Sequence, residues 1–179
     1  MSSKRDVRRS SVVLIGMPGA GKSTLGVVLA KILNKGFVDT DLLLQSHCGC
    51  TLQAFMDSHG AQALIDAEGD VLSSVTAEDA IIATGGSAVY SPSGMGNLTQ
   101  LGPIVYLQIS YESLEERLED LDERGVVMRD GTSMSLRDLY NERVPLYERY
   151  ADITVNVDGL SITAAARKAA AAVRDLLPS

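Results

Sequence analysis

Eight consecutive residues near the start of the chain have the types and spacing of a phosphate-binding loop. The stretch Gly16-Met17-Pro18-Gly19-Ala20-Gly21-Lys22-Ser23 fits the pattern GxxxxGK[ST], with an apolar run before it and a helical pattern after it. Glycines let successive backbone N–H groups turn toward phosphate oxygens, and a helix start adds positive charge. Lys22 supplies a mobile charge for the β and γ phosphates, and the Ser23 hydroxyl can bind Mg²⁺. The loop predicts binding of a nucleoside triphosphate with magnesium.

Two acidic residues follow the next apolar run. Asp39 and Asp41 stand two positions apart, directly after Phe37 and Val38. If strand geometry continues through them, both carboxylates point to one face at the carboxyl end of that strand. One could hold Mg²⁺ through water, and the other could accept a hydrogen bond from an attacking hydroxyl or take its proton. The alternative is a solvated helix cap.

A second glycine loop, Gly85-Gly86-Ser87, comes directly after the apolar run 81–84. Residues without a Cβ are needed where the backbone approaches a ligand closely. The alternative interpretation is a plain tight turn, so this loop indicates a ligand site only in combination with the other motifs.

The elements that must position these residues alternate along the chain. Strands are predicted at 11–15, 37–39, 81–84, 104–107 and 153–155, and helices at 22–33, 51–58, 61–75, 110–124, 135–147 and 161–177. Repeated βα units of this length predict an α/β protein with a parallel sheet and helices on both faces. In such sheets ligands bind beyond the carboxyl ends of the strands, which is where the three polar clusters fall.

Composition excludes several classes of protein. The 179 residues suit one globular domain, and 45% hydrophobic with 22% charged residues argues against disorder, collagen and a coiled coil. Sixteen Lys and Arg against 23 Asp and Glu give a net charge of −7, which disfavours nucleic acid as a partner. No run approaches the roughly 18 to 20 apolar residues of a membrane span. We expect a basic tail at 1–10 and a single domain at 11–179.

The same features predict a cytoplasmic monomer with no membrane partner. The basic, polar start lacks the apolar stretch of a signal peptide, and the two cysteines are too few for a stapled secreted scaffold. A five-strand core of this length leaves little room for the appended elements of motors and helicases. The chain also lacks a guanine-reading NKxD sequence. A small phosphotransferase is favoured.

Five segments together resemble the shikimate kinase family in order and spacing, from about residue 11 to 158. They are GMPGAGKST, FVDTD, ATGGSAV, the arginines at 117 and 124, and ERVPLYERYAD. The resemblance implies a three-layer P-loop fold like that of nucleoside monophosphate kinases, with a five-stranded parallel sheet and a mobile lid at about 124–134. It also implies that Mg-ATP phosphorylates a hydroxyl of shikimate, in aromatic amino-acid biosynthesis.

The resemblance assigns roles to individual positions. It implies that the nucleotide is bound by Gly16, Gly19, Ala20, Gly21, Lys22, Ser23, Thr24 and Arg117, the last of which packs on adenine. It places Mg²⁺ on Ser23 and Asp39. It places the hydroxy-acid substrate on Asp41, Gly85, Gly86, Ser87, Arg143 and position 65, with Arg143 on the carboxylate. Its catalytic set is Lys22, Asp41 and the lid arginine Arg124, for which Arg129 is a competing choice because this lid is two residues longer.

The sequence departs from the family pattern in the substrate region. Shikimate kinases usually read GExxFRxxE, whereas residues 60–68 keep the glycine and the last glutamate but have Ala61 and Ile65 in place of the first glutamate and the arginine. That arginine forms a second clamp on the substrate carboxylate in the family. The third glycine of GGG is Ser87, and the lid reads RGVV instead of RPLL. Truncating one partner of a buried charge pair costs roughly 2–5 kcal/mol, enough to change which substrate is preferred.

Three functions stay open on the sequence. The chain could be a shikimate kinase in which another basic residue, such as Arg129, replaces the lost clamp. It could be a paralogue that phosphorylates another small hydroxy acid or an amino acid such as homoserine, whose ammonium group suits nearby acids. It could be a nucleotide-binding regulator without transfer activity, although the intact Lys22, Asp39 and Asp41 argue against that.

Overall fold

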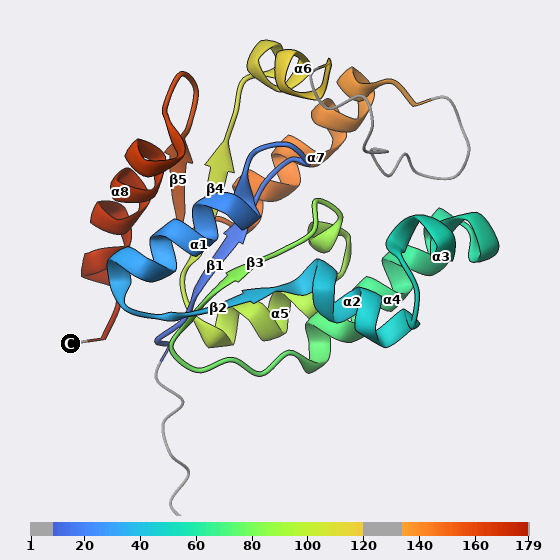
Figure 1. Ribbon diagram of the computed structural model, residues 1–179, viewed down its shortest axis with the longest axis horizontal. Coiled ribbons are helices and arrows are strands. Elements are labelled where there is room, and N and C mark those ends of the chain that lie inside the picture. The colour runs from blue at the N-terminus through green and yellow to red at the C-terminus, as the bar shows by residue number, and fades with distance from the viewer. Residues whose placement is uncertain (1–8, 120–133, 179) are drawn as a thin grey trace, which may run out of the picture.

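Five parallel strands form one sheet at the centre of the molecule (Figure 1). The computed structural model describes residues 9–119 and 134–178. The strand order is β2-β3-β1-β4-β5, and all four pairings are parallel. The strands are β1 (Val12–Ile15), β2 (Gly36–Asp39), β3 (Ala80–Ala83), β4 (Ile104–Gln108) and β5 (Ile153–Asn156). The predicted five-stranded parallel sheet is confirmed.

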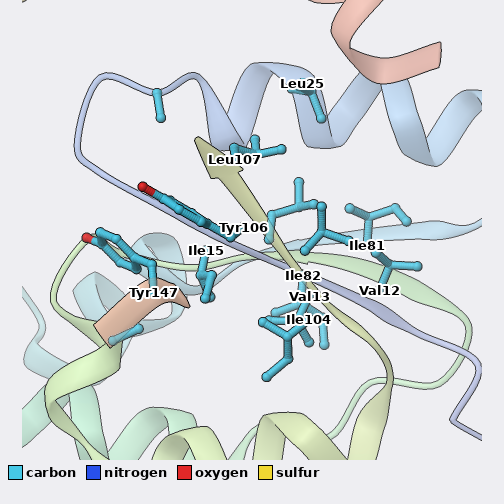
Figure 2. Close-up of a cluster of buried hydrophobic side chains, with 14 of the residues drawn as sticks. Val12, Val13, Ile15, Leu25, Ile81, Ile82, Ile104, Tyr106, Leu107 and Tyr147 are labelled. Atoms are coloured by element: carbon cyan, nitrogen blue, oxygen red, sulfur yellow. The ribbon is translucent and has the colours of Figure 1, made fainter. Parts of the chain in front are cut away.

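Helices cover both faces of this sheet. Helix α1 packs against α8 on one face, and α5 lies on the other face, where it packs against α4 (Figures 1 and 2). The described helices are α1 (Lys22–Leu33), α2 (Thr40–Cys48), α3 (Leu52–His59), α4 (Ala61–Ser74), α5 (Pro92–Leu101), α6 (Tyr111–Glu119), α7 (Leu136–Tyr150), α8 (Ile162–Val173) and the 3₁₀ turns η1 (Ala88–Tyr90) and η3 (Arg174–Leu176). Two helical layers around a parallel sheet are the three-layer α/β arrangement that the sequence predicts.

The core is built around β1, whose four residues Val12–Ile15 are all fully buried. A strand covered on both faces needs a continuous apolar run, which is why this segment shows no alternation. Beside it, the Tyr106 ring of β4 stacks on the Tyr147 ring of α7 with centroids 5.2 Å apart (Figure 2). The Tyr147 hydroxyl donates a hydrogen bond to the Gly86 carbonyl at 2.6 Å. These contacts fix α7 against the sheet and against the second glycine loop.

Register places the ends of three strands at one level. Ala83 of β3 pairs with Leu14 of β1 on one side and with Asp39 of β2 on the other. The phosphate loop follows β1, the acidic pair follows β2 and the second glycine loop follows β3, so all three leave the sheet at the same edge. The sheet therefore brings together segments that lie far apart in the sequence.

Two helices were not predicted, and one of them changes the account of the acidic pair. Helix α2 begins at Thr40, directly after β2, and Asp39 is its N-cap, accepting a hydrogen bond from the Asp41 N–H at 2.9 Å. The condition that strand geometry continues through Asp41 is therefore not met, and the alternative interpretation, a helix cap, holds for Asp39. Helix α5 begins at Pro92, and the Ser91 side chain caps it.

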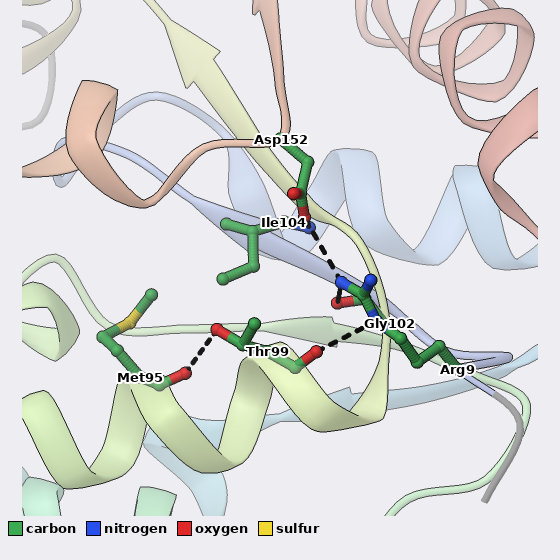
Figure 3. Close-up of polar contacts among 6 residues, drawn as sticks. All are labelled: Arg9, Met95, Thr99, Gly102, Ile104 and Asp152. Atoms are coloured by element: carbon green, nitrogen blue, oxygen red, sulfur yellow. Dashed lines mark hydrogen bonds and ion pairs between the residues drawn. The ribbon is translucent and has the colours of Figure 1, made fainter.

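The first described residues, which the sequence assigned to a tail, contact the body of the protein. The Arg9 guanidinium donates hydrogen bonds to the carbonyls of Thr99 at 3.1 Å and Gly102 at 3.4 Å, and it lies 3.6 Å from an Asp152 carboxylate oxygen (Figure 3). The Ser10 hydroxyl accepts a hydrogen bond from the Asp79 N–H. Within 9–119 and 134–178, no helix has the length and apolar character that crossing a membrane requires.

Candidate active site

The phosphate loop turns from β1 into α1 through backbone conformations that favour glycine. Gly19 has φ of +82° and Gly21 has φ of +89°, both in the region that L side chains rarely adopt. Gly21 is the N-cap of α1, and among the described residues no side chain caps this helix start. Ser23 and Thr24 lie exposed in its first turn. The loop therefore presents uncapped N–H groups and the positive end of a helix, which is the arrangement that binds phosphate.

Lys22 lies inside this loop. Its side chain is only 7% exposed, and Nζ donates hydrogen bonds to the carbonyls of Gly16 at 2.7 Å and Met17 at 2.9 Å. Burial lowers the pKa of Lys22 to about 8, and the charge of Asp41 is the largest influence opposing that change. The ammonium group is thus held by carbonyl oxygens of the phosphate loop itself.

The acidic pair divides into two different environments. Asp39 is partly exposed, and one of its carboxylate oxygens caps α2. Asp41 lies in the first turn of α2, where burial raises the pKa of its carboxyl while the charge of Lys22 opposes the rise. A carboxylate with a raised pKa takes a proton from a hydroxyl more readily. The two acids therefore differ: the Asp41 carboxyl has a raised pKa, whereas the partly exposed Asp39 carboxylate caps a helix.

The second glycine loop packs tightly against both the acids and the phosphate loop. A Cβ built on Gly85 would collide with Oε1 of Glu68 and would lie 2.9 Å from Oδ1 of Asp41. A Cβ on Gly86 would lie 2.7 Å from the Pro18 ring and 3.0 Å from Nη1 of Arg143. Larger residues would push these groups apart, so the glycines are what allow the acids and the arginine to converge.

Arg143 reaches this point from the middle of α7. It is 1% exposed, and its Nε donates a hydrogen bond to the Tyr90 hydroxyl at 3.2 Å. The guanidinium carbon lies 5.2 Å from the centre of the Tyr90 ring. Since a guanidinium has five N–H donors in a rigid fork, Nη1 and Nη2 can still bind a planar carboxylate while Nε is held.

Glu68 is a member of this cluster that the sequence analysis left out of the site. It is 4% exposed, its Oε2 accepts a hydrogen bond from the Ser87 hydroxyl, and among the described residues Oε1 has no hydrogen-bond partner. Burial raises the pKa of Glu68 to about 7, and the Ser87 hydrogen bond is the largest influence opposing that rise. The available signal was its position, because Glu68 is the last glutamate of the family pattern GExxFRxxE that residues 60–68 retain, but its burial could not be known from the sequence.

The remaining predicted positions fall into three groups. On α6, Nη1 of Arg117 lies 3.5 Å from the carbonyl oxygens of both Gly19 and Ala20, so this arginine is placed over the phosphate loop. On α4, Ile65 is 8% exposed and lines a pocket of about 470 Å³ together with Tyr90. The two lid candidates, Arg124 and Arg129, lie outside the described residues.

This fold and this cluster define a P-loop kinase that acts on small molecules. A family model described as shikimate kinase matches residues 18–174. The shikimate kinase of Francisella tularensis subsp. holarctica is 34% identical over 158 residues, which cover 87% of this chain and 90% of the relative. The shikimate kinase of Francisella philomiragia subsp. philomiragia is similar to the same extent. The chain therefore belongs to the shikimate kinase family.

Solved structures agree with this assignment. The shikimate kinase from Acinetobacter baumannii, solved in complex with shikimate, superposes with a TM-score of 0.80 at 28% identity and covers 93% of each chain. The shikimate kinase from Aquifex aeolicus gives a TM-score of 0.73 at 26% identity, covering 92% of this chain and 96% of that one. The expected fold, family and kinase activity are confirmed, whereas the roles of the single residues stay predictions.

Proposed function

We propose that this chain transfers the terminal phosphoryl group of ATP to a hydroxyl of shikimate in the presence of Mg²⁺. The observation that carries the proposal is the convergence of Lys22, Asp41 and Arg143 around Gly85 and Gly86, beyond the ends of β1, β2 and β3. A phosphate-binding cation, a base and a carboxylate-binding fork meet there. The related enzyme from A. baumannii, solved with shikimate, supports the choice of acceptor.

The residues at the phosphate loop fit ATP and magnesium. Ser23 offers an exposed hydroxyl and Asp39 a partly exposed carboxylate, and oxygen donors of this kind are the ligands that Mg²⁺ prefers. When bound, Mg²⁺ neutralises charge that develops on the transferring phosphoryl group. Uncapped N–H groups of α1 bind the phosphates, Lys22 exchanges its two carbonyl partners for phosphate oxygens, and Arg117 packs beside the base of the nucleotide.

The acceptor end of the site supplies the other half of the reaction. Arg143 binds the carboxylate of the acceptor and so orients it over Gly85 and Gly86. Asp41 accepts a hydrogen bond from the reacting hydroxyl and takes its proton as the new bond to phosphorus forms and the bond to the leaving ADP oxygen breaks. Lys22 stays with the phosphates throughout, and the lid arginine, assigned to Arg124 by resemblance, would add positive charge to the transferring group.

A second acceptor class is favoured by one observation. Ile65 is buried on α4 and offers no hydrogen-bond donor, and α4 contains no arginine that could join Arg143 on a carboxylate. Another small hydroxy acid or homoserine has less need of a second carboxylate clamp. Such an acceptor would lose less binding free energy in this site than shikimate does.

The experiment that tests the proposal is a coupled ADP-release assay with Mg-ATP. Shikimate, homoserine, gluconate and nucleoside monophosphates are compared at equal enzyme concentration. Shikimate-dependent ADP release with a raised KM is the expected result, because only one arginine holds the carboxylate. No release with shikimate, combined with saturable release for homoserine or gluconate, would favour the second acceptor class. No release with any of these acceptors would overturn the proposal.

A further inference from the structure

Two positions at which this chain departs from its family lie near one carboxyl group, that of Glu68, one on the same helix and one on the second glycine loop. Ile65 and Glu68 stand three residues apart on α4, so their side chains share one helix face. An arginine at position 65 would therefore lie beside Glu68 and could pair with it, whereas isoleucine cannot. Ser87, which replaces the third glycine of the second loop, instead donates its hydroxyl hydrogen bond to Oε2 of Glu68.

The other carboxylate oxygen of Glu68 lies among the residues predicted to bind the acceptor. Oε1 is buried and has no hydrogen-bond partner among the described residues. It lies over the Cα of Gly85, and Oδ1 of Asp41 lies beside the same point. Gly86 follows directly, with Nη1 of Arg143 beside it. Oε1 is thus packed against Gly85, beside the predicted base Asp41 and one residue from the point where Arg143 meets Gly86.

Burying a hydrogen-bond acceptor atom that has no donor costs free energy. A ligand that supplies the donor recovers that free energy. Leaving such a group unpaired costs about 1–3 kcal/mol. Sites that hydrogen-bond a substrate group reject analogues lacking that group for the same reason. The orphaned oxygen is therefore a feature that can select among acceptors, and an apolar residue of similar shape at position 68 would abolish the selection.

We propose that Ser87 and Glu68 form an acceptor-reading pair in which Ser87 holds Oε2 and Oε1 accepts a hydrogen bond from a donor group on the acceptor. This inference rests on the proposed function, which locates the phosphate acceptor. The shared chemistry is a hydrogen-bond donor, which a non-reacting hydroxyl of shikimate or the ammonium group of a hydroxy amino acid can provide. Ser87 is a positioning residue here, and Glu68 determines specificity.

Charges around Glu68 are compatible with either donor. Burial raises the pKa of Glu68 to about 7 and Asp41 adds to the rise, whereas the Ser87 hydrogen bond and the charges of Arg143 and Lys22 favour the ionised form. An ammonium donor adds a positive charge and favours the ionised carboxylate. A hydroxyl can donate to the carboxylate or to the carbonyl oxygen of the protonated group.

The test compares Glu68→Met and Ser87→Ala with the parent chain on matched acceptors. One comparison uses shikimate and analogues that each lack one non-reacting hydroxyl. The other uses homoserine and 4-hydroxybutanoate, which lacks the amino group. We expect Glu68→Met to lower kcat/KM about tenfold or more for an acceptor that bears the donor. The loss should disappear for the analogue without the donor, and the KM for ATP should stay the same.

If the difference appears between shikimate and its analogues, the donor is a hydroxyl. If it appears between homoserine and 4-hydroxybutanoate, the donor is the ammonium group. Ser87→Ala should show the same dependence on the acceptor with a smaller loss, since it only releases Glu68. Glu148→Met, an exposed site on α7, is the matched control and should change neither constant. Equal losses for both members of each pair, a parallel rise in the KM for ATP, or no loss at all would overturn the inference.

Failure of the proposed function gives a different result. In that case the parent chain itself releases no ADP with either acceptor. Calorimetric titration of shikimate and homoserine into the parent chain and Glu68→Met, with a non-hydrolysable ATP analogue bound, still measures whether acceptor binding depends on Glu68. Melting temperatures establish that both variants fold. Binding that is equal in parent and variant, or absent from both, overturns the acceptor-reading pair.

Discussion

The Nε of Arg143 donates a hydrogen bond to the Tyr90 hydroxyl at 3.2 Å, and this contact orients the guanidinium predicted to bind the acceptor carboxylate. The same hydroxyl donates to Oε1 of Glu142 at 2.5 Å. Tyr90 therefore ties η1 to two successive residues of α7. An arginine whose Nε is held loses less rotational freedom when Nη1 and Nη2 bind a carboxylate.

Tyr90→Phe should raise the KM for the acceptor about fivefold, since one hydrogen bond of this kind contributes about 1 kcal/mol. The kcat and the KM for ATP should change little, because the hydrogen bonds of this hydroxyl join Arg143 and Glu142 at the predicted acceptor end of the site. Steady-state kinetics with each substrate varied in turn measure both effects. Tyr140→Phe removes a hydroxyl that donates to the Ile109 carbonyl instead, and it serves as the control. A fall in kcat with unchanged acceptor KM would contradict the positioning role.

Asp41→Asn should lower kcat by a factor of roughly 10² to 10⁴, the usual contribution of a positioned general base. The amide keeps the size of the side chain but cannot take the proton of the attacking hydroxyl. ATP affinity should be retained, because the predicted nucleotide contacts lie on the phosphate loop and at Arg117 on α6. Asp57→Asn on the exposed surface of α3 is the matched control. Retention of most of the turnover in Asp41→Asn would remove this residue from proton transfer.

The fold could be predicted where burial dictates the residue type. The fully buried run of β1 is apolar throughout, and this pattern predicts a strand. Helix α2 was not predicted because its sequence has no apolar stripe at helical spacing. Leu42 and Leu43 are exposed, and the buried residues are Thr40 and Leu44. Such a helix depends on its Asp cap and its neighbours rather than on its own pattern.

Helix α5 shows how packing can override helix propensity. It contains two glycines, which normally weaken a helix. A Cβ on Gly94 would lie only 2.7 Å from the Cβ of Leu72 on α4, so the glycine allows the two helices to approach each other. The sequence shows the unfavourable residue but not the neighbouring helix that requires it.

The site was predictable to the extent that its motifs are local. Eight adjacent positions define the phosphate loop, and the spacing of Asp39 and Asp41 marks the acids even though the reason given for their orientation was wrong. Glu68 is marked only as the retained last glutamate of the family pattern at residues 60–68, which does not reveal its surroundings. Its environment depends on Ser87, nineteen residues later in the chain, and on burial by the surrounding elements. Contacts of this kind exist only once the sheet has brought β3 beside the other segments.

Ile65→Arg should lower the KM for shikimate about tenfold or more, because a second guanidinium would join Arg143 on the carboxylate. The new side chain can also pair with Glu68 one turn further along α4, which offsets the cost of placing a charge at a buried position. Ile65→Leu conserves volume without adding a donor and should leave the kinetics unchanged. Kinetics and melting temperature are measured for both variants. A folded Ile65→Arg variant with no gain on shikimate would contradict the argument from this position.

Glu68 should also make the stability of the protein depend on pH. Its pKa is about 7 in the folded chain and near 4.5 when unfolded, so between these values the native state binds more protons than the unfolded state. Stability attributable to this group therefore falls as pH rises from about 4.5 to about 7, by a total of about 3 kcal/mol, and stays at the lower level above pH 7. Glu68→Gln cannot titrate. The difference in unfolding free energy between this variant and the parent chain, measured with urea at pH 5 and pH 8, should shift in favour of the variant at the higher pH. An equal difference at both pH values would show that the buried carboxyl titrates normally.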